Sequence, residues 1–299
     1  MKYESFVLFL NDNKIEYYQN YLSSRINTFE VGGEVKILIY PKNKFQLCLI
    51  LNRLYNENLK YFLIGNGSNI YFTDHYNGVV VSTVKINKIA IYNNVLIAEC
   101  GADISDCSFV ALSSHLSGLE FAYGIPGTVG GGIYMNCSAY GGIISDVVKK
   151  SIVYDISNNK ISLINNAEHF FENKRSVFLD KNKILLSTAF GLKKSSYDGI
   201  LNNMKINLLK RINAQPLEYG SAGSAFKRPK NAYASKLIDE CLLKGFSIND
   251  ASVSEKHAGF IINKGNATYK DIEDLLKYLK KQIFDKYGID LEEEIILVE

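Results

Sequence analysis

The sequence predicts an α+β fold, in which strands cluster together with helices instead of alternating strictly with them. Short β-like segments, separated by turn residues, follow one another between residues 79 and 100 and again between 147 and 190. Segments with a helical spacing of apolar residues precede, separate and follow these two groups. The chain contains no internal repeat and no low-complexity stretch. These observations indicate a globular protein of mixed architecture.

The first elements lead into a glycine-bearing turn. Residues 35–40 alternate apolar and polar side chains before Pro41, which predicts a strand. Residues 44–57 carry apolar side chains at helical spacing, which predicts a helix. The short apolar run at 61–64 then ends in the glycine-bearing stretch 65–69.

The later elements are assigned from the same two periodicities. A helix is expected from Thr268, whose hydroxyl can cap it in concert with Asp271. A change of composition near 191–196 marks the best domain boundary. The other β-like segments are 70–72, 79–81, 89–92, 95–100, 147–155, 160–164, 184–190, 259–262 and 295–298, and the other helical ones are 103–116, 193–213 and 233–242.

Composition and charge exclude several classes of protein. With 299 residues, 47% of them hydrophobic and 22% charged, the chain can bury a sizeable core in one or two domains. A net charge of +3 is too small for a typical nucleic-acid binder, so no nucleic-acid partner is expected. The early apolar run 5–10 stops at Asn11, and no stretch approaches the roughly 20 apolar residues of a membrane span. We therefore expect a cytoplasmic protein without a membrane partner.

The cysteines argue against a metal site and against a disulfide framework. There are five, an odd number, and none forms a CxxC pair. Reduced and mostly buried thiols are expected, with no bound metal.

The stretch 124–132 (Gly-Ile-Pro-Gly-Thr-Val-Gly-Gly-Gly) is the most informative of the chain. Five of its nine residues lack a Cβ atom, and Pro126 fixes one backbone angle. Glycine costs ordering entropy, and a common reason for accepting that cost is the close approach of a ligand to the main chain. A phosphate group bound by backbone N–H donors is the most frequent ligand of this kind.

The stretch 65–69 (Gly-Asn-Gly-Ser-Asn) supplies a second bare turn. It resembles the start of a dinucleotide-binding fingerprint, but Ile70 stands at the third glycine position and the residues that follow are β-like. No GxxxxGK[ST] motif occurs either. A plain hairpin turn is one interpretation. Two glycine-bearing turns, each following a β segment, favour the other, in which both hold one diphosphate.

The motifs of the chain, taken in order from about residue 25 to the C-terminus, resemble the UDP-N-acetylenolpyruvoylglucosamine reductase family. The resemblance begins with Ile26-Asn27-Thr28-Phe29 and the two glycine-bearing turns, and it continues after them. The later motifs that carry it are Met135-Asn136, residues 139–142, Gln215-Pro216-Leu217, residues 221–229 and residues 253–263.

The resemblance implies a flavoprotein of peptidoglycan precursor synthesis. NADPH would reduce a non-covalently bound FAD, and the flavin would pass a hydride to the enolpyruvyl group of a UDP-sugar. The implied fold is a two-subdomain FAD-binding domain of the vanillyl-alcohol oxidase type, at 1–74 and 75–192, with a C-terminal α+β substrate domain at 193–299. The FAD-binding residues that it implies are Thr28, Gly65, Asn66, Gly67, Ser68, Asn69, Gly124, Ile125, Pro126, Gly127, Thr128, Gly130 and Gly131.

Three residues would carry the chemistry. Hydride addition to an enol ether conjugated with a carboxylate places negative charge on that carboxylate, as an enediolate. Arg175 matches the family's arginine that can hold this carboxylate bidentately. Ser224 matches the family's proton donor, and Glu294 matches its C-terminal catalytic glutamate. In a strand, Glu293 would point away from the face that carries Glu294.

Substrate contacts are expected at Lys174, Arg211, Lys227 and Arg228. Two positions depart from the family pattern. Lys174 stands where a tyrosine is usual, and Asn249-Asp250 replaces glycines in a turn. No inserted tyrosine loop is found between residues 236 and 263, which indicates the short form of the family, and His257 is expected to be structural.

Two other functions stay open from the residues alone. One is an oxidase of a small alcohol on the same FAD fold, and the other is a non-catalytic nucleotide-binding protein that keeps the turns. For the reductase, a monomer is expected.

Overall fold

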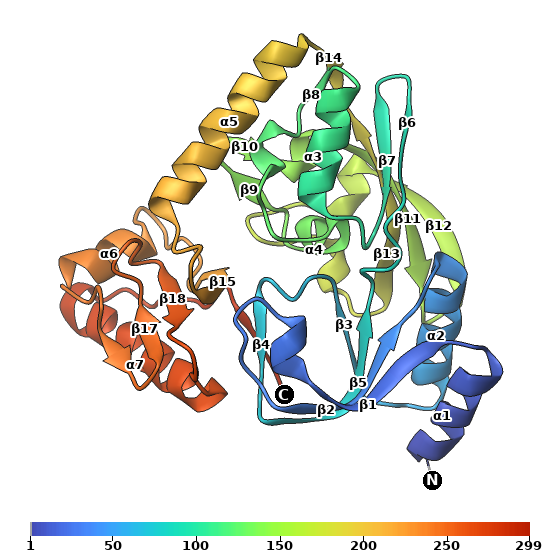
Figure 1. The fold of residues 1–299 in the computed structure, drawn as a ribbon, viewed down its shortest axis with the longest axis horizontal. Coiled ribbons are helices and arrows are strands. Elements are labelled where there is room, and N and C mark those ends of the chain that lie inside the picture. Colours follow the sequence, from blue (N-terminus) through green and yellow to red (C-terminus); the bar gives the residue numbers. More distant parts are fainter. Residues whose placement is uncertain (1) are drawn as a thin grey trace. The chain divides into compact units, whose positions relative to one another are not determined.

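The computed structural model describes residues 2–299 and combines seven α-helices with nineteen strands within that range (Figure 1). The α-helices are α1 (Lys2–Asp12), α2 (Lys44–Asn56), α3 (Ile104–Ser113), α4 (Val129–Tyr134), α5 (Tyr197–Ala214), α6 (Ala234–Glu240) and α7 (Tyr269–Tyr287). Short 3₁₀ helices are η1 (Ser23–Ile26), η2 (Glu120–Ala122), η3 (Ile144–Asp146), η4 (Asn166–His169) and η5 (Val177–Leu179).

The strands fall into three larger sheets and three strand pairs. Their bounds are β1 (Glu16–Leu22), β2 (Glu34–Tyr40), β3 (Tyr61–Ile64), β4 (Ile70–Phe72), β5 (His75–Ser82), β6 (Ile89–Tyr92), β7 (Val95–Glu99), β8 (Leu116–Ser117), β9 (Ser138–Ala139), β10 (Gly142–Ile143), β11 (Val148–Asp155), β12 (Lys160–Asn165), β13 (Lys183–Gly191), β14 (Lys193–Lys194), β15 (Gly220–Ser224), β16 (Ser247–Ile248), β17 (Ala251–Val253), β18 (Phe260–Asn263) and β19 (Ile296–Val298).

The chain forms two compact units, each assembled from separate stretches of sequence. Unit 1 comprises the described residues up to Gln19 together with Ile37–Asn66 and Gly78–Leu209. Unit 2 comprises Asn20–Lys36, Gly67–Asn77 and Lys210–Glu299. The three consecutive domains expected from the sequence, 1–74, 75–192 and 193–299, stay a prediction.

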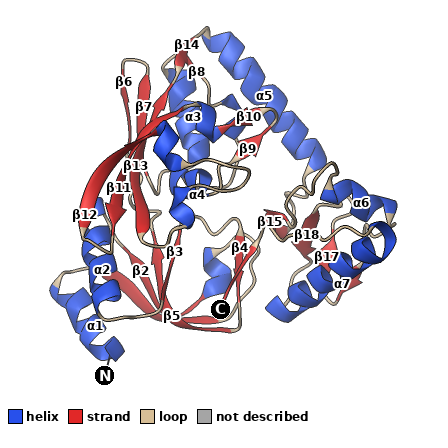
Figure 2. Ribbon diagram, turned by 180° about the vertical axis from the view of Figure 1, so that it is seen from behind, coloured by secondary structure: helices blue, strands red, loops and turns tan. Residues whose placement is uncertain are grey.

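Unit 1 is built on a five-stranded antiparallel sheet with the order β12-β11-β13-β7-β6 (Figure 2). Strand β13 lies at its centre and is almost wholly buried, because its run Ile-Leu-Leu-Ser-Thr-Ala-Phe is apolar or small on both faces. Helices α3 and α4 pack against this sheet. A second sheet has the order β1-β2-β5-β3, and its strands β3 and β5 are parallel. Strand β3 ends at Ile64, immediately before the first glycine turn.

Unit 2 contains the antiparallel sheet β15-β18-β17-β16 and the helices α6 and α7. The apolar face of α7 is buried in the core of this unit through Ile272, Leu275, Leu276, Leu279 and Ile283. The last strand, β19, pairs in parallel with β4. Strand β19 thereby fixes the residues just before it, where Glu294 lies.

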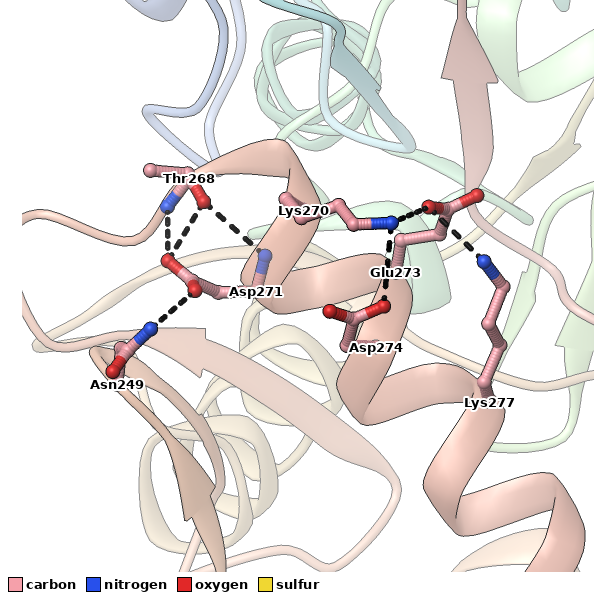
Figure 3. A network of polar contacts seen from close by, with 7 residues as sticks. All are labelled: Asn249, Thr268, Lys270, Asp271, Glu273, Asp274 and Lys277. Carbon is pink, nitrogen blue, oxygen red and sulfur yellow. Dashed lines mark hydrogen bonds and ion pairs between the residues drawn. The ribbon is translucent and has the colours of Figure 1, made fainter.

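The N-terminus of α7 shows the capping chemistry that the sequence predicted. The Thr268 hydroxyl accepts the Asp271 N–H at 3.2 Å, and the Asp271 carboxylate accepts the Thr268 N–H at 2.8 Å (Figure 3). Asn249 adds a further contact, from its Nδ2 to Asp271 Oδ1 at 2.7 Å. Burial raises the pKa of the Asp271 carboxyl, but the hydrogen bonds from Thr268 and Asn249 outweigh burial and leave it below its ordinary value.

The Asn249-Asp250 departure is a turn variation that the structure uses. Asn249 has φ +49° in the two-residue turn between β16 and β17, a conformation that asparagine tolerates better than most residues. The Asp250 carboxylate accepts the Asn266 N–H at 2.9 Å. The pair therefore gives up glycine freedom and gains side-chain contacts to the start of α7.

Several parts of the fold were not expected from the sequence, among them helix α4 and the short strands β8, β9, β10, β16 and β17. Helix α1 and strand β1 precede the first predicted element. Helix α5 begins at Tyr197 instead of at residue 193, because Lys193 and Lys194 pair with β8 as β14. Among residues 2–299, no helix is long and apolar enough to cross a bilayer.

Candidate active site

The second glycine turn, residues 124–132, uses most of its amides to hold itself in place. Thr128 is buried and caps α4, accepting the Gly131 N–H at 3.2 Å. The amides of Val129 and Gly130 donate to the carbonyls of Ala102 and Cys100, at 2.8 and 2.7 Å. The Gly124 N–H donates to Ser105 Oγ at 2.9 Å.

Two amides of this turn are left for a ligand. For the N–H groups of Gly127 and Thr128, the part of the chain that is described offers no hydrogen-bond acceptor. They follow Pro126, which has no N–H group, and directly precede the N-terminus of α4. Such a pair of donors suits an anionic oxygen.

Gly65 of the first turn lies directly against Thr128 of the second. A Cβ atom built on Gly65 would lie 2.1 Å from Thr128 Oγ1 and 2.9 Å from its Cγ2. Glycine at 65 is therefore required by close packing of the two turns. The amides of Gly65 and Asn66 also find no acceptor within the described residues.

The remaining half of the first turn belongs to unit 2. Gly67 has φ +64°, and a Cβ atom there would lie 2.2 Å from the Ile26 carbonyl oxygen. Its own carbonyl accepts the Thr28 N–H at 3.2 Å. The Thr28 hydroxyl donates to the Ser221 carbonyl at 2.7 Å, so this threonine ties the turn to β15.

The amides of Gly67, Ser68 and Asn69 likewise have no acceptor in residues 2–299. Unit 2 thus contributes three consecutive N–H donors of this turn. A diphosphate is a ligand that needs several donors at close range from a main chain without side-chain obstruction. Within unit 1, the free amides of Gly65, Asn66, Gly127 and Thr128 fit the diphosphate of FAD.

Arg175 lies in a narrow loop of unit 1 between η4 and η5. Glu172 and Arg175 form a reciprocal backbone bridge, at 3.1 and 3.3 Å. Asn136 Nδ2 donates to the Glu172 carbonyl at 2.9 Å, and Ser176 Oγ donates to the Tyr134 carbonyl at 2.9 Å. The loop is therefore fastened to the C-terminal end of α4, while the Arg175 side chain is exposed and makes no recorded hydrogen bond or ion pair with the rest of residues 2–299.

Lys174, one of the predicted substrate residues, lies near Cys137. Burial raises the pKa of the Cys137 thiol to about 12, and the positive charge of Lys174 acts in the opposite direction. Lys174 has φ +58°, an uncommon conformation for a residue with a Cβ atom. The positive charge of Lys174 therefore acts on Cys137, in the segment that follows α4.

Ser224 ends β15 after a β-bulge. The pairing of β15 with β18 shifts register between Ser221 and Ser224, and Gly223 in the bulge has φ +79°. Ser224 is half-buried, and its hydroxyl has no hydrogen-bond partner among the described residues. A bulge of this kind turns a side chain out of the regular alternation of an edge strand.

Glu294 lies beside Ser224 along the backbone of unit 2. Its N–H donates to the carbonyl of Ala225 at 2.8 Å, and its own carbonyl accepts Asn69 Nδ2 at 2.9 Å. The preceding glutamates have cationic partners, since Glu293 accepts Lys280 Nζ at 3.1 Å and Glu292 pairs with Lys227 Nζ. The backbone of Glu294 therefore lies next to that of Ser224, whereas the side chains of Glu292 and Glu293 are held by lysines.

The remaining predicted substrate residues have different surroundings. The Lys227 ammonium is paired with Glu292, and the Arg228 guanidinium lies 3.9 Å from the centre of the Tyr233 ring. Arg211 is buried in α5 and donates to Gln215 Oε1 at 2.9 Å. Their roles toward a substrate stay predictions.

His257 has the surroundings of a structural residue. Its Nδ1 accepts the Gly259 N–H at 3.0 Å, and its ring packs edge-on against Phe260. Burial lowers the pKa of the imidazole. Within residues 2–299, no group of three or more His, Cys, Asp or Glu side chains could hold a metal ion.

Known proteins match this arrangement along nearly the whole chain. Residues 35–157, which contain both glycine turns, match an FAD binding domain, and residues 215–298 match the C-terminal domain of UDP-N-acetylenolpyruvoylglucosamine reductase. The reductase of that name from Caldicellulosiruptor bescii is 41% identical over 97% of this chain and 93% of its own length. The chain belongs to the UDP-N-acetylenolpyruvoylglucosamine reductase family.

A second reductase sequence and a reductase crystal structure also match nearly the whole chain. The enzyme from Clostridium novyi is 41% identical over 96% of this chain and 93% of its own length. The crystal structure of the reductase from Thermus caldophilus superposes with a TM-score of 0.79 at 26% identity, covering 95% of this chain and 99% of that one. The predicted fold class is confirmed, and the chain is an FAD-containing oxidoreductase.

Sequence reasoning missed the contacts that hold the reductase residues in place. Asn136 and Ser176 fasten the Arg175 loop, Asn69 holds the backbone of Glu294, and Asp103 binds Asn66. The signal in the sequence was the recurrence of asparagine in the motifs, at Asn66 and Asn69 of the first glycine turn and at Asn136. Asparagine side chains carry two donors and an acceptor, and in bare turns they commonly bond to backbone groups.

Proposed function

We propose that this chain carries out the reaction for which its family is named. It reduces the enolpyruvyl group of UDP-N-acetyl-3-O-(1-carboxyvinyl)-glucosamine to give UDP-N-acetylmuramate, a precursor of peptidoglycan, with NADPH as the reductant. The observation that carries the assignment of roles is in unit 2, where the partnerless Ser224 hydroxyl lies next to the backbone position of Glu294.

When bound, FAD would supply the hydride chemistry between NADPH and the double bond of the substrate. The chain's contribution is to hold the cofactor by its diphosphate. In unit 1 the unused amides of Gly65, Asn66, Gly127 and Thr128 support this role, and in unit 2 those of Gly67 to Asn69 do so. Neither Cys nor His occurs within 65–69 or 124–132, which supports non-covalent binding.

Arg175 would hold the carboxylate of the enolpyruvyl group. Hydride addition to the terminal carbon leaves a carbanion that is delocalised into this carboxylate, so negative charge grows there as the reaction proceeds. A guanidinium that offers two parallel N–H donors stabilises the charge better than an ammonium group does. The exposed guanidinium on a fastened loop supports this role, because such a side chain is available to a ligand while its backbone is fixed.

Ser224 would then donate its proton to the α-carbon. A hydroxyl is a weak acid, but a carbanionic intermediate is basic enough to take its proton. The partnerless Ser224 hydroxyl supports this role, because its proton is not committed to a protein acceptor. Glu294, fixed one residue away through the Ala225 carbonyl, is the carboxyl group that can return a proton to the site.

The finer partner assignments belong to the same proposal. We infer that the enzyme acts as a monomer in the cytoplasm, where its nucleotide substrates are made, without a nucleic-acid or membrane partner. Lys174, Lys227 and Arg228 supply positive charge that suits the phosphates of a UDP-sugar, and Arg211, buried in α5, would act from within the fold.

The test is Ser224→Ala with the two half-reactions measured separately under anaerobic conditions. NADPH should bleach the flavin at the parent rate, because the serine takes no part in that step. Reoxidation by the enolpyruvyl nucleotide should slow by about 10²–10⁴-fold, the usual contribution of a general acid. Ser247→Ala, which removes a hydroxyl from another strand of the same sheet, serves as the matched control and should leave both rates unchanged.

An unchanged rate of reoxidation in Ser224→Ala removes Ser224 from its proposed role. Consumption of oxygen by the NADPH-reduced enzyme without any response to the enolpyruvyl nucleotide would contradict the proposed reaction as a whole.

A further inference from the structure

Within unit 1, Asp103 connects the beginning of the first glycine turn with the second glycine turn, although it belongs to neither. It is the N-cap of α3, and its Oδ1 accepts the N–H groups of Ser105 and Asp106, at 2.7 and 3.4 Å. Its second oxygen, Oδ2, accepts Asn66 Nδ2 of the first turn at 3.2 Å. One carboxylate therefore serves a helix and a turn at once.

The backbone on either side of Asp103 holds the second turn. The Ile104 N–H donates to the Gly127 carbonyl at 2.9 Å, and the Ala102 carbonyl accepts the Val129 N–H at 2.8 Å. These two bonds form an antiparallel bridge between Asp103 and Thr128. Ser105, whose N–H is bound by Asp103, accepts the Gly124 N–H on its hydroxyl. The N-terminal end of helix α3 thus contacts the second glycine turn at its beginning, at Gly124, and at its middle, at Gly127 and Val129.

A helix cap alone does not explain an aspartate at this position. Serine, threonine or asparagine would cap α3 about equally well without a charge. The carboxylate is about half-buried, and burial raises its pKa, which shows that the charged form is disfavoured here. It also lies beside amides that suit an anion, so its charge opposes anion binding. What a carboxylate adds over a hydroxyl is a second acceptor atom, and that atom holds Asn66.

We propose that Asp103 is a positioning residue for FAD binding. It fixes Asn66 through its side chain and residues 127–129 through its backbone, so that the free amides of Gly65, Asn66, Gly127 and Thr128 keep the spacing that a diphosphate needs. The inference rests on the proposed role of the two glycine turns and adds a residue that contributes through their geometry without being a cofactor ligand.

The experiment measures FAD affinity on the full chain after removal and titration of the flavin, with flavin fluorescence as the signal. Asp103→Ala should raise the Kd for FAD by about 10–100-fold, the loss typical when a group that orients ligand-binding residues is removed. The matched control is Asn43→Ala, which removes the N-cap of α2 in the same unit. It should lower the melting temperature of the flavin-free protein about as much as Asp103→Ala does, while the Kd stays unchanged.

Asp103→Ser separates capping from positioning. Serine keeps an acceptor for the α3 amides but has no second oxygen for Asn66, so the Kd should still rise about tenfold or more. Combining Asp103→Ser with Asn66→Ala should raise the Kd no further than the stronger single change, because both remove the same contact. Parent-like affinity in Asp103→Ser, or equal losses of affinity in Asp103→Ala and Asn43→Ala, overturns the proposal.

The variant Gly65→Val distinguishes a failure of the Asp103 proposal from a failure of the proposed function. If Gly65→Val binds FAD normally, the assigned role of the glycine turns is wrong. If Gly65→Val loses affinity while both Asp103 variants bind FAD as the parent does, the turns hold the cofactor and only the role of Asp103 is wrong.

Discussion

The two glycine turns look alike in the sequence and use their glycines differently. In residues 65–69 every backbone amide lacks an acceptor within the described chain, whereas in residues 124–132 only Gly127 and Thr128 keep a free N–H. The longer turn, with five glycines, offers fewer donors than the shorter one, with two. A high glycine content therefore indicates that other atoms approach the main chain closely. It does not say whether these atoms belong to a ligand or to the protein itself.

The contacts of individual glycines show why. A Cβ atom on Gly130 would lie 2.9 Å from the Cys100 carbonyl oxygen, and one on Gly132 would meet Ile104 at 2.9 Å and Cys137 at 3.1 Å. These glycines allow α4 to pack closely against Cys100, Ile104 and Cys137 in unit 1. Gly65 differs from them, because it both packs closely and supplies an unused donor.

The largest effect is expected for Gly65→Val. The new side chain would overlap Thr128, whose Oγ1 would be only 2.1 Å from the added Cβ, and the two turns would have to separate. Overpacking of this kind costs about 1–3 kcal/mol, and the same energy taken from cofactor binding weakens FAD by about 10–100-fold. Titration of the flavin-free variant with FAD measures the loss. Parent-like affinity would mean that the two turns do not act on one ligand.

A smaller effect, of another kind, is expected for Gly130→Ala. Alanine is normally favoured over glycine in a helix by up to about 1 kcal/mol, but here the methyl group would be forced against the Cys100 backbone. We expect a net loss of about 1–2 kcal/mol in the free energy of unfolding, with FAD affinity reduced by no more than about threefold. Urea denaturation of the flavin-free protein gives the first quantity and FAD titration the second. A stable variant that fails to bind FAD would show that Gly130 faces the cofactor after all.

The sequence could predict those features whose cause is local. The α7 cap depends on Thr268 and Asp271, three residues apart, and it was expected from their chemistry alone. The ends of β3 and β6 were likewise set by runs of apolar residues next to turn residues. Helix α1 was not predicted, because its apolar run, 5–10, is short.

The details of the site depend on contacts across long sequence separations, which no local pattern encodes. Asn66 meets Asp103 37 residues later, Asn136 meets Glu172 36 residues later, and Asn69 meets Glu294 225 residues later. The resemblance named Arg175, Ser224 and Glu294, but it could not show that Ser224 follows a bulge or that Glu292 and Glu293 are engaged by lysines. Those features require the pairing of strands that are far apart in the chain.

The smallest effect, and the sharpest test of the comparison, is expected for Gly131→Ala. The nearest atom to an added Cβ is Thr128 Oγ1 at 3.6 Å, an ordinary contact, and the Gly131 amide is already bound to that oxygen. Alanine should therefore stabilise the flavin-free protein by roughly 0.5–1 kcal/mol and raise its melting temperature by about 1–4 °C. FAD affinity should change by less than about twofold if only amides that lack a protein partner bind the cofactor. A marked loss of affinity would place the flavin against the Cα of Gly131, and the role of a glycine in this turn would then be decided by the space around it and not by its N–H group.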